Sequence, residues 1–257
     1  MNDEIVGRVA ELWRYPVQSM RGEAMREVAI WANGMPGDRA WGVLNPAEGK
    51  LAAAAKGKKP WRDLIRWQAR FLREPEKSQP NAPVEIRLPE DDAAGALPIK
   101  SDAPDRDARI AAALGEPTEL VARHIGNQTY GYASLHLLTT ASLAALSRHY
   151  PAGRFEPVRF RPNIVIDSGA LEGFVEQDWI GARLSLGEAE LEVADHCLRC
   201  VLTTLPQGEL PLDPGILKAT TEANERRAGI YAAVVKTGRI RIGDAVRLLR
   251  PVSRSGA

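Results

Sequence analysis

RLSLGEAELEVA, residues 183–194, alternates apolar and polar side chains on both sides of a central Gly-Glu pair. Leu184 and Leu186 precede the pair, and Leu191 and Val193 follow it. Alternation with this period is typical of a β-strand with one buried face, and Gly at the break is typical of a tight turn. The segment therefore predicts a β-hairpin.

Further short apolar segments around this hairpin predict more strands. We expect strands at 5–12, 24–31, 40–44, 84–88, 163–166, 201–205, 231–236 and 245–249. Capping residues and terminating Gly or Pro predict helices at 102–114, from Thr139 or Thr140 to Pro151, and at 213–227. We therefore predict a mainly β fold with α-helices (α+β): a barrel-like N-terminal domain over residues 1–125, and a β-barrel domain with peripheral helices over 126–257.

Composition narrows the functional classes. The 257 residues carry a net charge of +1, which gives no basic field for nucleic acid. Apolar runs are too short to cross a membrane, and residues 1–9 lack the apolar core of a secretory signal. We expect a cytoplasmic protein with a small-molecule substrate and no nucleic-acid or membrane partner.

The two cysteines of the chain, Cys197 and Cys200, lie close together in HCLRCVLTT, residues 196–204. A thiolate is a soft ligand for a transition metal, and the neighbouring Arg199 is expected to favour the ionised form of Cys200. Cys200 is therefore the candidate metal ligand.

The cysteine pair also allows three alternative roles. A structural zinc site needs two more ligands, and the chain has no second Cys pair and only four His residues. A thioredoxin-like dithiol needs a helix after the pair, whereas residues 201–204 have the pattern of a strand. Two inert buried thiols are the third alternative.

Two further segments carry groups suited to an anion. In RFRPN, residues 159–163, Arg161 offers a fork of donors and Asn163 adds both donors and an acceptor. YPVQSMRG, residues 15–22, and GDRAW, residues 37–41, supply Ser19 and Arg39. Taken singly, Arg residues beside a strand, as in 159–163, are more often solvated than bound to a ligand, and the other two segments also fit a plain turn between strands.

Together, these segments resemble the MOSC-domain family, which includes the C-terminal domain of molybdenum cofactor sulfurase and the mitochondrial amidoxime-reducing component. Residues 15–22 and 37–41 resemble the family's N-terminal β-barrel domain. Residues 160–163, 197–204 and 229–244 resemble the MOSC domain itself. The resemblance covers nearly the whole chain.

The resemblance implies a molybdenum cofactor (molybdopterin) between the two domains, with Cys200 bonded to molybdenum as the catalytic and metal-binding residue. It also implies cofactor contacts from Ser19, Arg39, Arg161, Asn163, Thr139 and Tyr231. Gln18 stands where relatives have Lys, and the segment 51–59 lacks their polar pattern, with Lys56 as the substitute basic residue.

The implied function is an oxidoreductase that reduces N-hydroxylated compounds. No ferredoxin-like Cys cluster follows the MOSC segment, so we expect electrons from a separate donor protein, a ferredoxin- or flavin-type reductase. A cofactor carrier or sulfur-transfer protein acting through Cys200 is the alternative. A third hypothesis is a metal-free binding module for another small anion.

Overall fold

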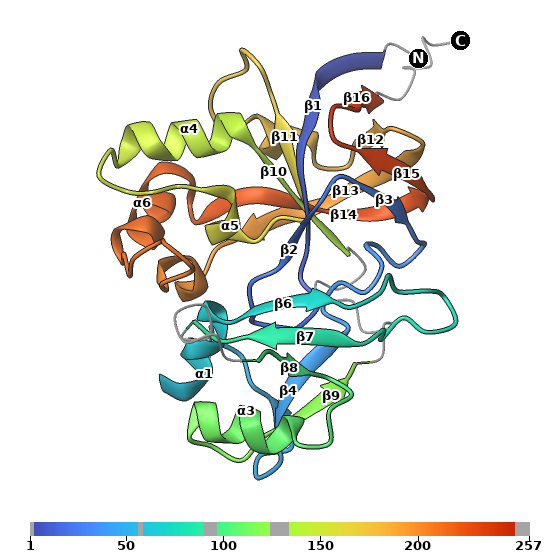
Figure 1. Ribbon diagram of the computed structural model, residues 1–257. Helices are drawn as coiled ribbons and strands as arrows, with labels where there is room; N and C mark the ends of the chain where they lie inside the picture. Colours follow the sequence, from blue (N-terminus) through green and yellow to red (C-terminus); the bar gives the residue numbers. More distant parts are fainter. Residues whose placement is uncertain (1–2, 56–58, 90–96, 124–133, 250–257) are drawn as a thin grey trace.

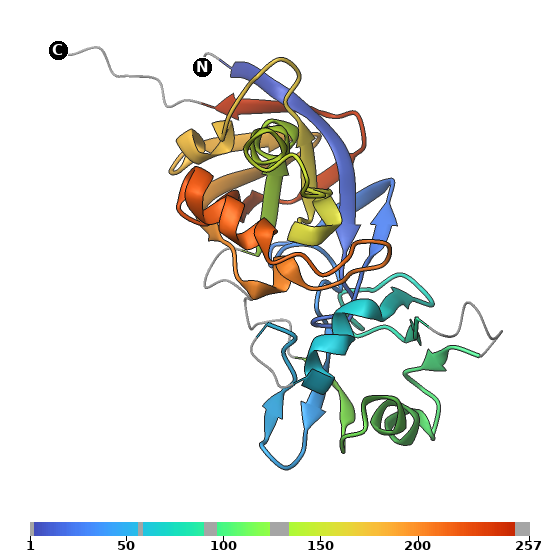
Figure 2. The same cartoon turned by 90° about the vertical axis from the view of Figure 1, so that its left-hand side faces the viewer.

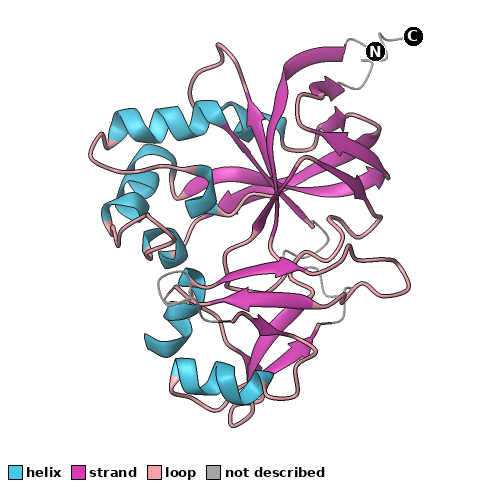
Figure 3. Cartoon of the chain, in the orientation of Figure 1, coloured by secondary structure: helices cyan, strands magenta, loops and turns pink. Residues whose placement is uncertain are grey.

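The strand β1 (Asp3–Arg14) extends along a barrel toward a smaller body below it, as Figure 1 shows. This computed structural model describes residues 3–55, 59–89, 97–123 and 134–249. The main sheet has the order β11-β10-β14-β13-β12-β16-β1-β2, and an additional pairing of β11 with β1 closes it, β2 excepted, into a barrel. The predicted mainly β architecture is confirmed, and strands dominate both bodies in Figure 3.

The strands that complete the barrel sheet are β2 (Glu23–Met25), β10 (Leu135–Thr139), β11 (Ile164–Asp167), β12 (Arg183–Leu186), β13 (Ala189–Leu198), β14 (Arg227–Lys236) and β16 (Ala245–Leu249). The predicted hairpin is β12 and β13, with Leu184 opposite Leu191 and Leu186 opposite Ala189. These four side chains are fully buried in the barrel interior.

The smaller body contains two three-stranded sheets, ordered β5-β4-β9 and β6-β7-β8. Their strands are β4 (Trp41–Asn45), β5 (Lys50–Leu51), β6 (Gln68–Phe71), β7 (Val84–Arg87), β8 (Ile99–Lys100) and β9 (Glu119–Ala122). The short helices α1 (Lys59–Asp63) and η1 (Leu64–Arg66) and the longer α3 (Arg106–Leu114) pack beside them. The predicted boundary at residue 125 lies outside the described residues.

Helices cover one side of the barrel, as Figures 1 and 2 show. They are α4 (Thr140–His149), α5 (Pro157–Phe160) and α6 (Gly215–Asn224), and the 3-10 helices η2 (Val175–Trp179) and η3 (Val201–Thr204) lie at strand ends. The three predicted helices are confirmed as α3, α4 and α6. In the part of the chain that the structure describes, no helix is both long and apolar enough to span a membrane.

Two strand predictions are wrong. Residues 24–31 form not one strand but two, because β2 pairs with β1 while β3 (Glu27–Ile30) turns away to pair with β15 (Gly238–Arg241). The segment predicted as a strand at 201–205 is the helix η3. The hydroxyls of Thr203 and Thr204 donate to the carbonyl oxygens of Cys200 and Val201, at 3.0 and 2.8 Å. These local bonds satisfy the backbone without a neighbouring strand.

Candidate active site

A cleft of about 510 Å³ lies where the two bodies meet. Its described lining includes four arginines and no Asp or Glu: Arg39 and Arg123 come from the smaller body, and Arg161 and Arg199 from the barrel side. Cys200 lies in the same lining and is exposed to solvent. The cleft therefore combines one accessible thiol with a concentration of positive charge.

The structure brings together five of the residues predicted for the site. Cys200, Ser19, Arg39, Arg161 and Tyr231 all line the cleft, although they come from five separate parts of the sequence. Gln18 lines it too, so the segment 15–22 contributes an uncharged amide at that point. Lys56, the predicted substitute base, lies outside the described residues.

Three of these residues hold an uncommon backbone conformation. Ser19, Arg39 and Arg161 have φ angles of 68°, 54° and 58°, in the left-handed region. A residue with a Cβ adopts this backbone region at a cost of roughly 1–2 kcal/mol, and residues in such strained conformations are concentrated at functional sites. Three strained residues in one cleft indicate that their side-chain positions are under functional constraint.

Local hydrogen bonds maintain these conformations. The amide of Arg39 donates to the Tyr15 carbonyl oxygen at 2.6 Å, and the amide of Arg161 donates to the Pro157 carbonyl oxygen at 3.2 Å. Ser19 Oγ accepts from the Ala54 amide at 3.1 Å, so its hydroxyl oxygen is tied to the neighbouring loop.

The buried Tyr15 holds two of the arginines. Its ring centroid lies 4.9 Å from Arg39 Cζ and 4.2 Å from Arg161 Cζ, distances of a cation–π contact. Its hydroxyl donates to the Pro162 carbonyl oxygen at 3.1 Å, which joins the smaller body to the barrel. The two guanidinium groups are therefore placed before any ligand binds.

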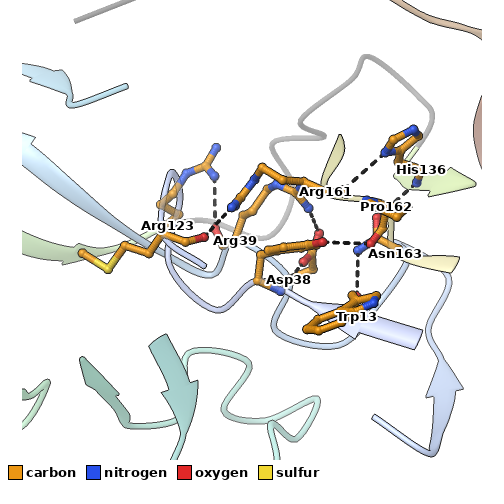
Figure 4. Close-up of polar contacts among 10 residues, drawn as sticks. Trp13, Asp38, Arg39, Arg123, His136, Arg161, Pro162 and Asn163 are labelled. Carbon is orange, nitrogen blue, oxygen red and sulfur yellow. Dashed lines mark hydrogen bonds and ion pairs between the residues drawn. The ribbon is translucent and has the colours of Figure 1, made fainter. Parts of the chain in front are cut away.

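Polar contacts fix the same two side chains further, as Figure 4 shows. Arg161 Nη1 donates to the Met20 carbonyl oxygen at 2.6 Å. Arg39 forms an ion pair with the buried Asp38, whose other carboxylate oxygen accepts from the Tyr15 amide at 2.8 Å. Asp38 offsets part of the positive charge without lining the cleft.

The two cysteines differ sharply in surroundings. Cys200 is exposed at the start of η3, whereas Cys197 is fully buried, and burial raises the pKa of the Cys197 thiol. The Arg199 guanidinium predicted to act on Cys200 lies instead on Cys197, with 2.6 Å between Arg199 Nη1 and Cys197 Sγ. The alternating direction of side chains along the end of β13 puts residues 197 and 199 on the inner side, which corrects the prediction.

Asn163 and Thr139 do not line the cleft, contrary to the contacts predicted for them. Asn163 is fully buried, and its side chain accepts from the His136 amide and donates to the Trp13 carbonyl oxygen, at 3.1 and 3.3 Å (Figure 4). Thr139 is fully buried at the start of α4, and its hydroxyl donates to Glu176 at 2.6 Å. Both side chains turn inward and support the strands behind the site.

Arg123 is a cleft residue that the sequence did not reveal. It follows β9, and its Nη1 donates to the Arg39 carbonyl oxygen at 3.1 Å (Figure 4). No motif surrounds it, because its place in the cleft depends on the pairing of β9 with β4. The nearest signal in the sequence is the predicted domain boundary at residue 125.

The donor set fits one kind of metal group. The described residues contain no cluster of three or more His, Cys, Asp or Glu side chains suited to a bare metal ion. What they offer is a single exposed thiol facing several guanidinium groups. This set suits a metal that brings most of its own ligands together with an anionic tail.

Comparisons with known proteins agree on one family. The model of the MOSC domain matches residues 122–247, and that of the MOSC N-terminal beta barrel domain matches 6–112. The YUAD protein from Bacillus subtilis superposes with a TM-score of 0.50 at 11% identity, over 94% of both chains, which is a likeness of fold alone.

Two named relatives carry the sequence similarity. Human mitochondrial amidoxime-reducing component 1 is 27% identical over 287 residues, covering 95% of this chain and 83% of the relative. Human mitochondrial amidoxime reducing component 2 is 31% identical over 128 residues, so the match spans 45% of this chain and 37% of that protein. With both domain models matched along most of its length, the chain belongs to the MOSC-domain family and carries the family's N-terminal β-barrel domain.

Proposed function

We propose that this protein is an oxidoreductase that holds a molybdenum cofactor in the cleft and reduces N-hydroxylated compounds. Two observations support this: the MOSC domain, whose family is associated with that cofactor, and similarity to relatives named as amidoxime-reducing components. Electrons would come from a separate donor protein, a ferredoxin- or flavin-type reductase. When bound, the cofactor would supply removal of the N-hydroxyl oxygen as water, a reduction that consumes two electrons from the donor protein and two protons.

The observation that carries the proposal is the position of Cys200 in the same cleft as Arg39 and Arg161. A thiolate is the soft donor that molybdenum accepts, and the two guanidinium groups balance the phosphate and the electron-rich dithiolene of the pterin. Hydrogen bonds to charged groups contribute about 1.5–3 kcal/mol each, so a few such contacts support tight retention without a basic surface.

The residues of the chain have separable tasks in this proposal. Arg39 and Arg161, already held by Tyr15, orient the anionic part of the cofactor. Cys200 provides the thiolate from the start of η3, where solvent and substrate reach it. Leu202 and Tyr231 line the same cleft and place apolar side-chain surface beside the thiol.

Metal analysis of the full chain tests this function. Protein made in a molybdate-fed, pterin-competent host should contain near-stoichiometric molybdenum and yield the fluorescent oxidised pterin. A Cys200→Ser variant should lose the reduction of a test amidoxime by more than a hundredfold. Leu212→Ser, at an exposed leucine outside the cleft lining, is the control that should retain it. Wild-type protein without molybdenum, or an active Cys200→Ser variant, contradicts the proposal.

A carrier of cofactor or sulfur is the second candidate, and the exposure of Cys200 together with the neutral Gln18 favours it. An uncharged side chain at this point weakens phosphate anchoring, which suits release. Incubation of the loaded protein with a cofactor-free molybdoenzyme discriminates the two functions. Transfer of molybdenum supports the carrier, and retention of it supports the reductase.

A further inference from the structure

The side chain of Arg199 points into the molecule, although both of its neighbours face outward. Leu198 is 55% exposed and Cys200 is exposed, whereas Arg199 is only 8% exposed. Its backbone amide donates to the Arg226 carbonyl oxygen at 2.7 Å, which holds the end of β13 against the start of β14. A long cation between two outward-facing residues is thus directed under the surface that carries the thiol.

The guanidinium of Arg199 connects three segments that are distant in sequence. It donates to Cys197 Sγ at 2.6 Å and to the Phe160 carbonyl oxygen at 2.6 Å, and its Nη1 lies 3.5 Å from His136 Nε2. Its Cζ lies 5.4 Å from the centroid of the Phe160 ring. One side chain therefore joins β13, α5 and β10 in the wall of the cleft, which Arg199 also lines.

The contact with Phe160 matters because the next residue is Arg161. Arg161 is in the left-handed region, and the carbonyl of Phe160 belongs to the peptide that sets its position. Arg199 bonds that carbonyl and, through Cys197, the strand end that leads to Cys200. A planar fork of donors satisfies acceptors in several directions, which the single ammonium of a lysine does not.

We propose that Arg199 is a positioning residue that fixes Cys200 relative to Arg161 and keeps the thiol of Cys197 out of the cleft. The chain thereby presents one of its two cysteines and withholds the other. This inference rests on the proposed function only in taking Cys200 as the metal ligand. The contacts themselves are testable in protein that carries no cofactor.

Alkylation of the full-length, cofactor-free protein by iodoacetamide tests the proposal, with each cysteine followed by mass spectrometry. In the wild type, Cys200 should react and Cys197 should be protected. Arg199→Gln should raise the rate at Cys197 at least tenfold and speed amide hydrogen exchange in residues 157–163. Arg199→Lys should raise exchange in that segment by a smaller factor, because the charge stays and the fork is lost.

Arg159→Lys is the control for a loss of stability alone. Arg159 is fully buried and donates to the carbonyl oxygens of Arg154, Thr203, Leu205 and Pro211, at 3.0, 3.0, 3.4 and 3.2 Å. It has no bond to either cysteine among these contacts, so its variant should lower the melting temperature and leave Cys197 protected.

Two results would overturn the proposal: unchanged protection of Cys197 in Arg199→Gln, or equal exposure of Cys197 in Arg159→Lys. If Arg199→Gln does not fold, Arg199→Lys decides, and wild-type exchange in residues 157–163 then rejects the positioning role. Failure of the proposed function is a separate result, since wild-type protein without molybdenum can still show the labelling pattern expected here.

Discussion

Gly229 lies in β14 where the backbone passes beside His136. Its φ is +85°, and a Cβ added there would lie 2.4 Å from His136 Nε2 and 2.5 Å from the Leu137 carbonyl oxygen. Its amide donates to the buried Glu176 at 3.1 Å. A side chain at this position therefore meets both a steric and a conformational barrier, next to the histidine that contacts Arg199.

Gly229→Ala should lower the free energy of unfolding by about 2–5 kcal/mol, from left-handed strain of roughly 1–2 kcal/mol and overpacking of roughly 1–3 kcal/mol. Urea denaturation measures it. Gly115→Ala is the matched control, because Gly115 has a φ of +69° with open space around it. Gly115→Ala should lower the free energy of unfolding by the left-handed strain alone, roughly 1–2 kcal/mol. Equal losses in the two variants would refute the steric part.

His136 should make stability depend on pH. Burial, followed by the positive charges of Arg199 and Arg39, lowers the pKa of His136 well below its ordinary value. The unfolded chain then binds a proton near pH 6.5 that the folded chain does not, so His136 contributes fully above that pH and its contribution falls as the pH drops. The loss is at most about 1.4 kcal/mol per pH unit.

Urea titrations at pH 7.5 and 5.5 measure this dependence. His136→Asn should flatten the profile, because it removes the buried group whose pKa is lowered in the folded chain. If His136→Asn leaves the dependence of the free energy of unfolding on pH unchanged, other groups cause that dependence.

Short motifs that resemble those of the MOSC family located Ser19, Arg39 and Arg161 in the sequence. Each of the three lies within three residues of a Pro or Gly, so its position depends on local backbone structure. Arg123 and Arg199 were missed or misdirected, because the direction of each side chain is set by pairing with a distant strand. The left-handed backbone of the first three is also invisible in the sequence, since Ser and Arg do not favour it.

At the scale of elements, the helix α4 shows how capping and the polar core are combined. Thr139 Oγ1 accepts from the Ser142 amide at 3.2 Å and donates to Glu176 at 2.6 Å. Ser142 Oγ also donates to Glu176, at 2.5 and 2.7 Å from its two oxygens. The predicted start of this helix was correct because an N-cap is a local feature, whereas Glu176 arrives from η2 and leaves no local signal.

Thr139→Ala should lower the free energy of unfolding by about 2–3 kcal/mol, since it removes an N-cap worth roughly 1 kcal/mol and one donor to a buried carboxylate. Thr139→Ser keeps the hydroxyl and should lose less than about 1 kcal/mol. Urea denaturation of both variants gives the comparison. Equal losses would mean that the methyl group, not the hydroxyl, carries the effect.

At the scale of the whole molecule, Arg14 at the end of β1 links the barrel to the smaller body. It is 2% exposed, and it pairs with Glu23 and Glu74, both at 2.8 Å. Its Cζ lies 4.7 Å from the centroid of the Phe71 ring in β6. Because the cleft lies between the same two bodies, this junction influences the spacing of its two walls.

Arg14→Met should lower the free energy of unfolding by about 3 kcal/mol, because it leaves the half-buried Glu23 without its cation. Glu74→Gln is the control. Glu74 is 74% exposed, so solvent screens its pair and the loss should stay under about 1 kcal/mol. Urea denaturation of each variant measures both losses. A similar loss in the two variants would show that the exposed pair, rather than burial of Arg14, holds the junction.

The place of β1 in the barrel affects folding during synthesis on the ribosome and the choice of fragment bounds for expression. β1 is synthesised before its barrel neighbours β11 and β16, which begin at Ile164 and Ala245. Its pairing with these two strands therefore forms only after nearly all of the described chain has been made. A fragment cut to the matched MOSC segment, 122–247, lacks β1, which closes the barrel, and ends inside β16. Such a fragment should aggregate through its two open edges, and co-expression of residues 1–22 as a separate peptide should restore its solubility.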